Sequence, residues 1–273
     1  QDDVARMSTS VCEAQTGNNK VDVIMKEKQL KLNLDKTVFI LSGRSSQFKK
    51  IREEMEKIPL TINGSKMKET IYEKYLGDII HAEGNEKSIE QTIQNRYWRI
   101  YSATLEVKSI LNDCRVNTKG GIACGLEVWE LGIIPMMLNN SETWFNINET
   151  SLKRLNSLQS TMFRYLFNTP RTTPLLALWW DLGALPIEFR LIKRKLNLVH
   201  HIIKLGAENI SNQILEEQIK YKFPGLAEEC KIYIEILQLP NIIDNRNLMM
   251  DKIMWKNWSK KPLLKNAKNT SLK

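Results

Sequence analysis

The sequence predicts an α+β fold in which a mixed α/β segment is followed by a helical one. Up to about residue 84, short β-branched runs alternate with turn residues. Beyond Gly84, apolar residues recur at steps of three and four, which is the period of a helix. A length of 273 residues with 42% hydrophobic side chains is enough to bury a core in one large domain or two small ones.

The first segment contains helix, strand and turn signals. The stretch MKEKQLKLN indicates the end of a helix, and KTVFILSG, closed by Gly43, indicates a buried strand. PLTINGSKMKETIYEKYLGDII predicts a hairpin, because Asn63-Gly64 is a strong two-residue turn signal. A second turn is expected at HAEGN. We therefore expect a small antiparallel sheet with a helix in this segment.

Four helices are expected beyond Gly84, and their approximate ranges are 85–111, 122–136, 148–165 and 186–205. Asn85 is the expected N-cap of the first helix. Pro135 is expected to kink or end the second. Gly206 lies just past the fourth, at the position where a helix often stops. After Gly206 the helical signal weakens.

The charge balance favours a polyanionic partner. Forty Lys and Arg against 31 Asp and Glu give a formal net charge of +9, and seven of the lysines lie in the final 23 residues. Nucleic acid ranks ahead of an acidic membrane as the partner. The lysine-rich end is an electrostatic tether, a solubility feature or a nuclear import signal.

Several classes of protein are disfavoured by the sequence. No apolar run approaches the roughly 20 residues that cross a bilayer, so no membrane partner is expected. The four cysteines form no CxxC pair, and with three histidines they offer no zinc spacing and no disulfide framework. This cysteine usage favours an intracellular protein, nuclear or cytoplasmic. The chain begins with Gln, so we expect its N-terminus to be truncated or processed.

Three stretches follow one another in the first segment: Asp2-Asp3, LKLNLDKTVFILSG and Tyr75-Leu76-Gly77. The helical segment contains GLEVWELGIIPMMLNNSETW and LNSLQSTMFRYLFNTPRTTPLLALWWDLGALPIEFRLIKRKL. In this order and spacing, they resemble the C-terminal half of the reverse transcriptases of non-LTR retrotransposons, over residues 1–205. The resemblance implies the C-terminal half of a polymerase palm at 1–84, a helical thumb or connection at 85–205, and a basic, weakly defined helical region at 206–273.

The resemblance also implies an activity, which is RNA-directed DNA polymerisation by two-metal nucleotidyl transfer with Mg²⁺ on an RNA template and a DNA primer. It makes Asp2 and Asp3 catalytic metal ligands, since Mg²⁺ prefers carboxylate oxygens. Lys36 matches a lysine that stabilises the leaving pyrophosphate, or else is a lysine snorkelling at a strand entrance. Tyr75-Leu76-Gly77 matches the region that steers the primer end, or else is strand packing with a glycine bend.

The sequence departs from the family at several points. Lys31 stands where the family usually has Gly, and the family's aromatic residue before the aspartate pair is not in this sequence. Neither is the upstream strand with the other catalytic aspartate, nor the nucleotide-binding fingers. We therefore expect this chain to be inactive alone. The alternatives are a non-catalytic nucleic-acid-binding protein on a polymerase-derived scaffold and a decayed relic. A group II intron or retron source is the alternative within the family.

Duplex binding needs cations and flat side chains more than carboxylates. Arg96 and Arg99 are three residues apart on one helix, so both are expected to reach one phosphate backbone. Trp98, between them, is either a nucleic-acid contact or a half-buried anchor. A second basic cluster on the fourth helix is the other candidate surface, or else an ordinary solvated face; it consists of Arg190, Lys193, Arg194 and Lys195.

Overall fold

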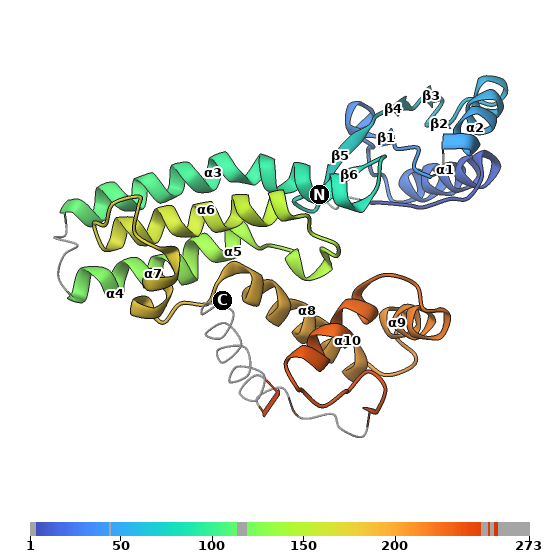
Figure 1. Ribbon diagram of the computed structural model, residues 1–273. Helices are drawn as coiled ribbons and strands as arrows, with labels where there is room; N and C mark the ends of the chain where they lie inside the picture. Colours follow the sequence, from blue (N-terminus) through green and yellow to red (C-terminus); the bar gives the residue numbers. More distant parts are fainter. Residues whose placement is uncertain (1–3, 44, 114–118, 247–250, 252–253, 256–273) are drawn as a thin grey trace. The chain divides into compact units, whose positions relative to one another are not determined.

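The computed structural model describes residues 4–43, 45–113, 119–246, 251 and 254–255 (Figure 1). The chain divides into two compact units, Gln1–Thr92 and Ile93–Lys273. The first holds small sheets with helices and the second is helical in its described part, so the predicted α+β class is confirmed at this level. The boundary between the units lies inside the long helix α3 (Asn85–Asp113).

Before α3 begins, the first unit contains two helices, one 3₁₀ turn and six short strands in its described part. In chain order they are α1 (Val11–Glu27), η1 (Leu34–Lys36), β1 (Val38–Phe39), α2 (Ser45–Lys57), β2 (Thr61–Ile62), β3 (Ser65–Lys66), β4 (Lys68–Glu69), β5 (Tyr72–Tyr75) and β6 (Asp78–His81). The expected helix end in MKEKQLKLN is confirmed by α1, whereas α2 was not expected from the sequence.

The hairpin expected at Asn63-Gly64 is confirmed. Strands β2 and β3 pair antiparallel around these two residues, whose φ angles of 50° and 73° are the positive values that a tight hairpin turn requires. A second hairpin, β5–β6, turns at Leu76-Gly77 in the same way, with φ angles of 48° and 93°.

We expected a small antiparallel sheet, and this prediction is wrong in detail. The described strands form three separate two-stranded sheets, and KTVFILSG contributes only Val38–Phe39, which pairs parallel to β4. Side chains of α1 explain why the β2 ladder goes no further. The Gln15 amide accepts from the Thr61 N–H at 2.8 Å and donates to the Thr61 carbonyl at 3.1 Å, as a neighbouring strand would. Asn18 donates to the same carbonyl.

The second unit continues α3 and adds the remaining helices of the described chain. They are α4 (Lys119–Val128), the π-helix η2 (Trp129–Ile133), α5 (Ile134–Met137), the 3₁₀ turn η3 (Ser141–Thr143), α6 (Glu149–Leu166), α7 (Leu175–Leu182), α8 (Ile187–Lys204), α9 (Ile210–Tyr221) and α10 (Leu226–Ile236). Helix α6 begins where the sequence predicts a helix, and its N-cap is Asn148, whose side chain accepts from the Ser151 N–H. Gly206 follows α8 with a φ of 83°.

The expected break at Pro135 takes the form of a π-helix just before it. Proline has no N–H to donate, and the Ile134 N–H bonds to the Trp129 carbonyl five residues back. This wider turn belongs to a segment that buries Trp129, Ile133 and Met137 almost completely. By length and composition alone, the helical stretch Gly120–Met137 would also be able to cross a membrane. About one third of this stretch is buried in the protein, including Trp129, Ile133 and Met137, and a single stretch of this kind does not indicate a membrane protein.

Residues 207–246 contain more helix than their sequence pattern predicts. Helices α9 and α10 pack with α8 around a core that includes Leu215, Cys230 and Trp255. The Trp255 ring stacks on the buried His200 imidazole of α8, with 5.0 Å between the centroids. The tertiary core, rather than a strong local signal, therefore stabilises these two helices.

Candidate nucleic-acid interface

The residues predicted to be catalytic are only partly described. Asp2 and Asp3 lie outside the described residues, so the structure does not test them. Lys36 ends the turn η1 with an exposed side chain, and its backbone N–H donates to Asn33. Among the described residues, no group of three His, Cys, Asp or Glu side chains lies close enough to hold a metal ion. The Mg²⁺ site stays a prediction.

Tyr75, Leu76 and Gly77 form the tip of the β5–β6 hairpin. Leu76 is 61% exposed and has a positive φ, a conformation that costs a leucine roughly 1–2 kcal/mol. The base of the hairpin is held by the start of α3. The Ile79 N–H donates to the Thr92 hydroxyl at 2.8 Å, and His81 is held in the same way by a serine of the first turn. The tip is therefore a fixed projection with an apolar side chain in solvent.

The outer face of α3 carries an exposed aromatic cluster. Trp98 is 66% exposed, which decides against the half-buried anchor. Its ring is held edge-on by two tyrosines, with centroid distances of 5.4 Å to Tyr97 and 6.2 Å to Tyr101. The two tyrosines stack on each other at 6.2 Å. The i, i+3 spacing of Trp98 and Tyr101 and the i, i+4 spacing of the two tyrosines bring these side chains together on the helix surface.

The two arginines beside Trp98 have different surroundings. Arg99 is exposed. The Arg96 guanidinium donates to the Asn139 carbonyl at 2.7 Å and lies 5.4 Å over the buried ring of Trp144. Arg96 therefore connects α3 to the chain after α5, and these contacts weigh against its predicted role as a phosphate ligand. Arg99 is the better candidate of the pair.

The charge along this part of α3 favours an anionic ligand. Between Glu90 and Glu106 the helix carries Arg96 and Arg99 and no acidic side chain. Apart from Arg99, the exposed residues next to Trp98 on the helix are polar and uncharged, and Asn95 is one of them. A cation and a flat aromatic ring on one acid-free helix face are the components that contact the backbone and bases of nucleic acids.

The basic cluster of α8 is engaged within the protein. Arg190 donates through both terminal nitrogens to the Glu130 carboxylate, Arg194 pairs with Glu142 at 3.3 Å, and Lys195 pairs with Glu229. Lys193 is half-buried and also has an interaction partner. These pairs connect α8 to η2, η3 and α10. The predicted nucleic-acid role of Arg190, Lys193 and Arg194 stays a prediction, and the pairs weigh against it, because binding phosphate would require breaking them.

No protein-family model, no curated protein and no solved structure matches this chain. The function is therefore argued from the residues and their geometry.

Proposed function

We propose that the chain is the C-terminal palm and thumb part of a reverse transcriptase of the non-LTR retrotransposon kind, and that its own contribution is to hold the primer–template duplex. The ordered series Asp2-Asp3, LKLNLDKTVFILSG and Tyr75-Leu76-Gly77 supports the polymerase origin. The exposed ring of Trp98 on an acid-free stretch of α3 is the observation that carries the binding function.

In this proposal, Trp98 stacks against a sugar or a terminal base of the duplex, because the other base faces are covered by their neighbours, and Arg99 contacts a phosphate. Base–aromatic stacking contributes about 1–3 kcal/mol per base, and it tolerates any sequence because every base has a flat face. Each neutralised phosphate releases counterions, so the affinity falls with salt. Asp2 and Asp3 supply carboxylates of the kind that Mg²⁺ accepts. The polymerase reaction itself needs a further carboxylate besides this pair.

The test is fluorescence anisotropy with a labelled RNA–DNA hybrid over a series of salt concentrations. We expect a Kd in the micromolar range, about 1–100 μM, as for other non-specific binding. Trp98→Ala is expected to raise the Kd by about 5- to 100-fold, which corresponds to the loss of one stacking contact. The matched control is Leu131→Ala, because Leu131 is 72% exposed in the same unit and lies on η2. It should leave the Kd unchanged.

The salt dependence of the affinity distinguishes a phosphate contact of Arg99 from the effect of the protein's overall positive charge. Arg99→Ala is expected to lower the slope of log K against log salt by about 1, the contribution of one phosphate contact. Lys204→Ala removes the same charge from the exposed end of α8 and should lower the slope less. Equal effects of both substitutions, or a Kd that does not depend on Trp98, would overturn the proposed interface. A larger Trp98 effect on single strands than on the hybrid would favour a single-strand-binding protein instead.

A further inference from the structure

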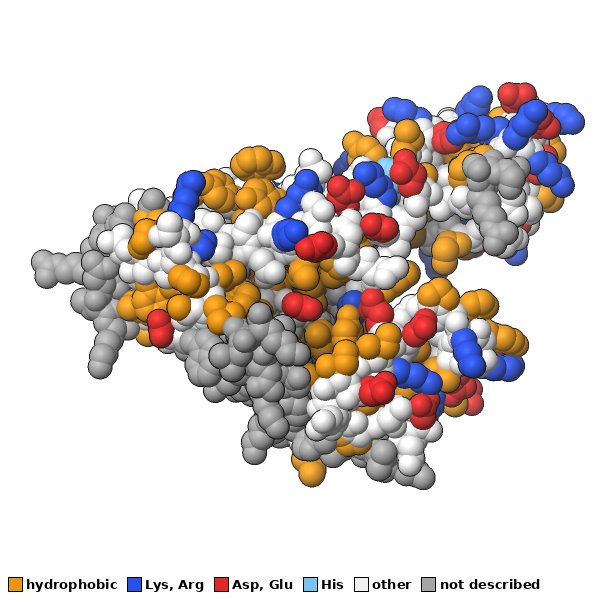
Figure 2. Space-filling model, in the orientation of Figure 1, with side chains coloured by type: hydrophobic (Ala, Val, Ile, Leu, Met, Phe, Trp, Pro, Cys, Tyr) orange, Lys and Arg blue, Asp and Glu red, His pale blue; other side chains and the backbone are white. Residues whose placement is uncertain are grey.

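Tyr97 and Tyr101 lie against the ring of Trp98 on α3. The Trp98 ring stands at 89° to the Tyr97 ring and at 88° to the Tyr101 ring, while the two tyrosine rings are almost parallel, with 6° between their planes. Edge-to-face pairs are favourable when the ring centroids lie about 4.5–7 Å apart. Figure 2 shows hydrophobic side chains together with Lys and Arg side chains along α3. The three rings therefore form one cluster, in which each ring restricts the other two.

The two tyrosines lie between the core and the exposed indole. Ile93 and Ile100 of α3 are 1% and 2% exposed, Trp98 is 66% exposed, and both tyrosines are half-buried. Residues three or four positions apart are neighbours on a helix surface, so Tyr97 lies beside Ile93 and Tyr101 beside Trp98. The tyrosine rings are therefore partly held by the core, while the Trp98 ring is in solvent.

A ring that is already held in place binds better than a mobile one. A large side chain that is free in solvent loses rotamer freedom when a ligand immobilises it, which weakens binding by roughly 2- to 10-fold for each such side chain. The Trp98 ring is in contact with two other rings before any ligand binds. Much of this loss therefore occurs on folding and not on binding.

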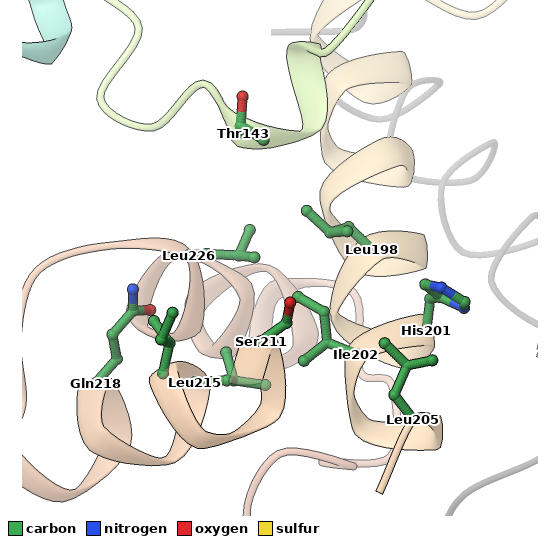
Figure 3. A pocket seen from close by; sticks show the side chains of 10 residues that line it. Thr143, Leu198, His201, Ile202, Leu205, Ser211, Leu215, Gln218 and Leu226 are labelled. Atoms are coloured by element: carbon green, nitrogen blue, oxygen red, sulfur yellow. The ribbon is translucent and has the colours of Figure 1, made fainter. Parts of the chain in front are cut away.

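The apolar groove of the second unit offers no comparable site (Figure 3). It has a volume of about 430 Å³ and lies between α8, α9, the turn η3 and the start of α10. The ten described residues that line it include no Lys, Arg, Trp, Tyr or Phe. The groove therefore lacks the cation and the flat ring that contact the backbone and bases of nucleic acids.

We propose that Tyr97 and Tyr101 are positioning residues of the nucleic-acid interface: they hold the Trp98 ring in its stacking orientation and act through it. This inference rests on the proposed function, because it requires Trp98 to be the stacking residue. It adds to that function a preformed surface, in which the Trp98 ring has the same orientation with and without nucleic acid.

The test uses fluorescence anisotropy with the labelled RNA–DNA hybrid. Tyr101→Ala should raise the Kd by about 2- to 10-fold, because the Trp98 ring becomes mobile. Tyr101→Phe keeps the aromatic ring and should leave the Kd unchanged. The matched control is Tyr221→Ala on α9, because Tyr221 is 54% exposed and belongs to another aromatic pair, 5.8 Å from Phe223. It should also leave the Kd unchanged.

A double-mutant cycle separates positioning from direct contact. In a Trp98→Ala background, Tyr101→Ala should have no further effect on the Kd, because no indole ring remains to be held. If Tyr101→Ala fails to fold, Tyr97→Ala takes its place in the same cycle.

Three results would overturn the inference. They are an equal effect of Tyr101→Ala in both backgrounds, no effect of Tyr101→Ala in the wild-type chain, and a loss with Tyr101→Phe as large as that with Tyr101→Ala. The last would show that the hydroxyl itself contacts the nucleic acid. A Kd that does not change with Trp98→Ala is a different result, because it overturns the proposed function and this inference with it.

Discussion

Replacing Glu229 with glutamine removes the counter-charge of a buried lysine. The side chain of Lys195 is 3% exposed and that of Glu229 is 21% exposed, which makes this the most buried of the described ion pairs. The other oxygen of Glu229 accepts from the Asn146 N–H at 2.7 Å, so the pair joins α8, α10 and the segment before α6. Lys195 also lies 5.9 Å from the ring centroid of Tyr233.

The two members of this pair should not be equivalent. Glu229→Gln leaves the Lys195 ammonium in a nearly dry site without a negative partner, and we expect it to cost about 3–5 kcal/mol of unfolding free energy. Lys195→Met leaves the Glu229 carboxylate, which water reaches and Asn146 still binds, so about 1–3 kcal/mol is expected. The double variant removes both charges and should cost less than the sum, with a coupling of about 1–3 kcal/mol.

The assay is urea denaturation at neutral pH, followed by tryptophan fluorescence, with a thermal melt as a second readout. Each kcal/mol should lower the Tm by about 2–4 °C in a unit of this size. Lys153→Met is the control, because the Lys153–Glu149 pair is exposed at 74% and 79% and solvent screening should leave it little effect on stability. The reasoning is refuted if Glu229→Gln costs no more than Lys195→Met, or if the two effects simply add.

Two further predictions follow from other parts of the structure. A Cβ added to Gly17 on α1 would lie 0.9 Å from a guanidinium nitrogen of Arg6, which bonds the Glu13 and Ala14 carbonyls. Gly17→Ala would displace this exposed side chain and its two hydrogen bonds, so its gain of about 1 kcal/mol of helix propensity should be smaller in the wild-type background than in an Arg6→Ala background, and an equal gain in both backgrounds in urea melts would contradict this. Burial raises the pKa of the Cys230 thiol to about 12 from an ordinary 9.0. Because the unfolded thiol loses its proton first, stability should fall above about pH 9 by up to about 1.4 kcal/mol per pH unit, and Cys230→Ala should show a smaller fall in urea melts at about pH 8 and pH 10.5.

Local signals were enough to predict the elements that short-range physics controls. The Asn63-Gly64 turn needs two positive φ angles, and asparagine and glycine adopt them at little cost. Helix α6 starts at an asparagine cap, and α8 stops before a glycine of positive φ. Helix α2 was missed because its many charged residues conceal a narrow apolar face, and α9 and α10 because their sequence signal is weak and the shared core stabilises them.

The sequence by itself determined the α+β class, the change to helix near Gly84 and the presence of cations on α3 and α8. Only the tertiary structure decided which of those cations are available. The sequence of a helix does not show whether its cations are solvated or ion-paired. The acids that pair with α8 lie 34 to 60 residues away in the chain, and they are Glu130, Glu142 and Glu229. The same holds for Trp98, because the exposure of a side chain depends on which elements pack around it. Short-range interactions determine the backbone conformation of these elements, and long-range packing determines which side chains stay exposed for binding.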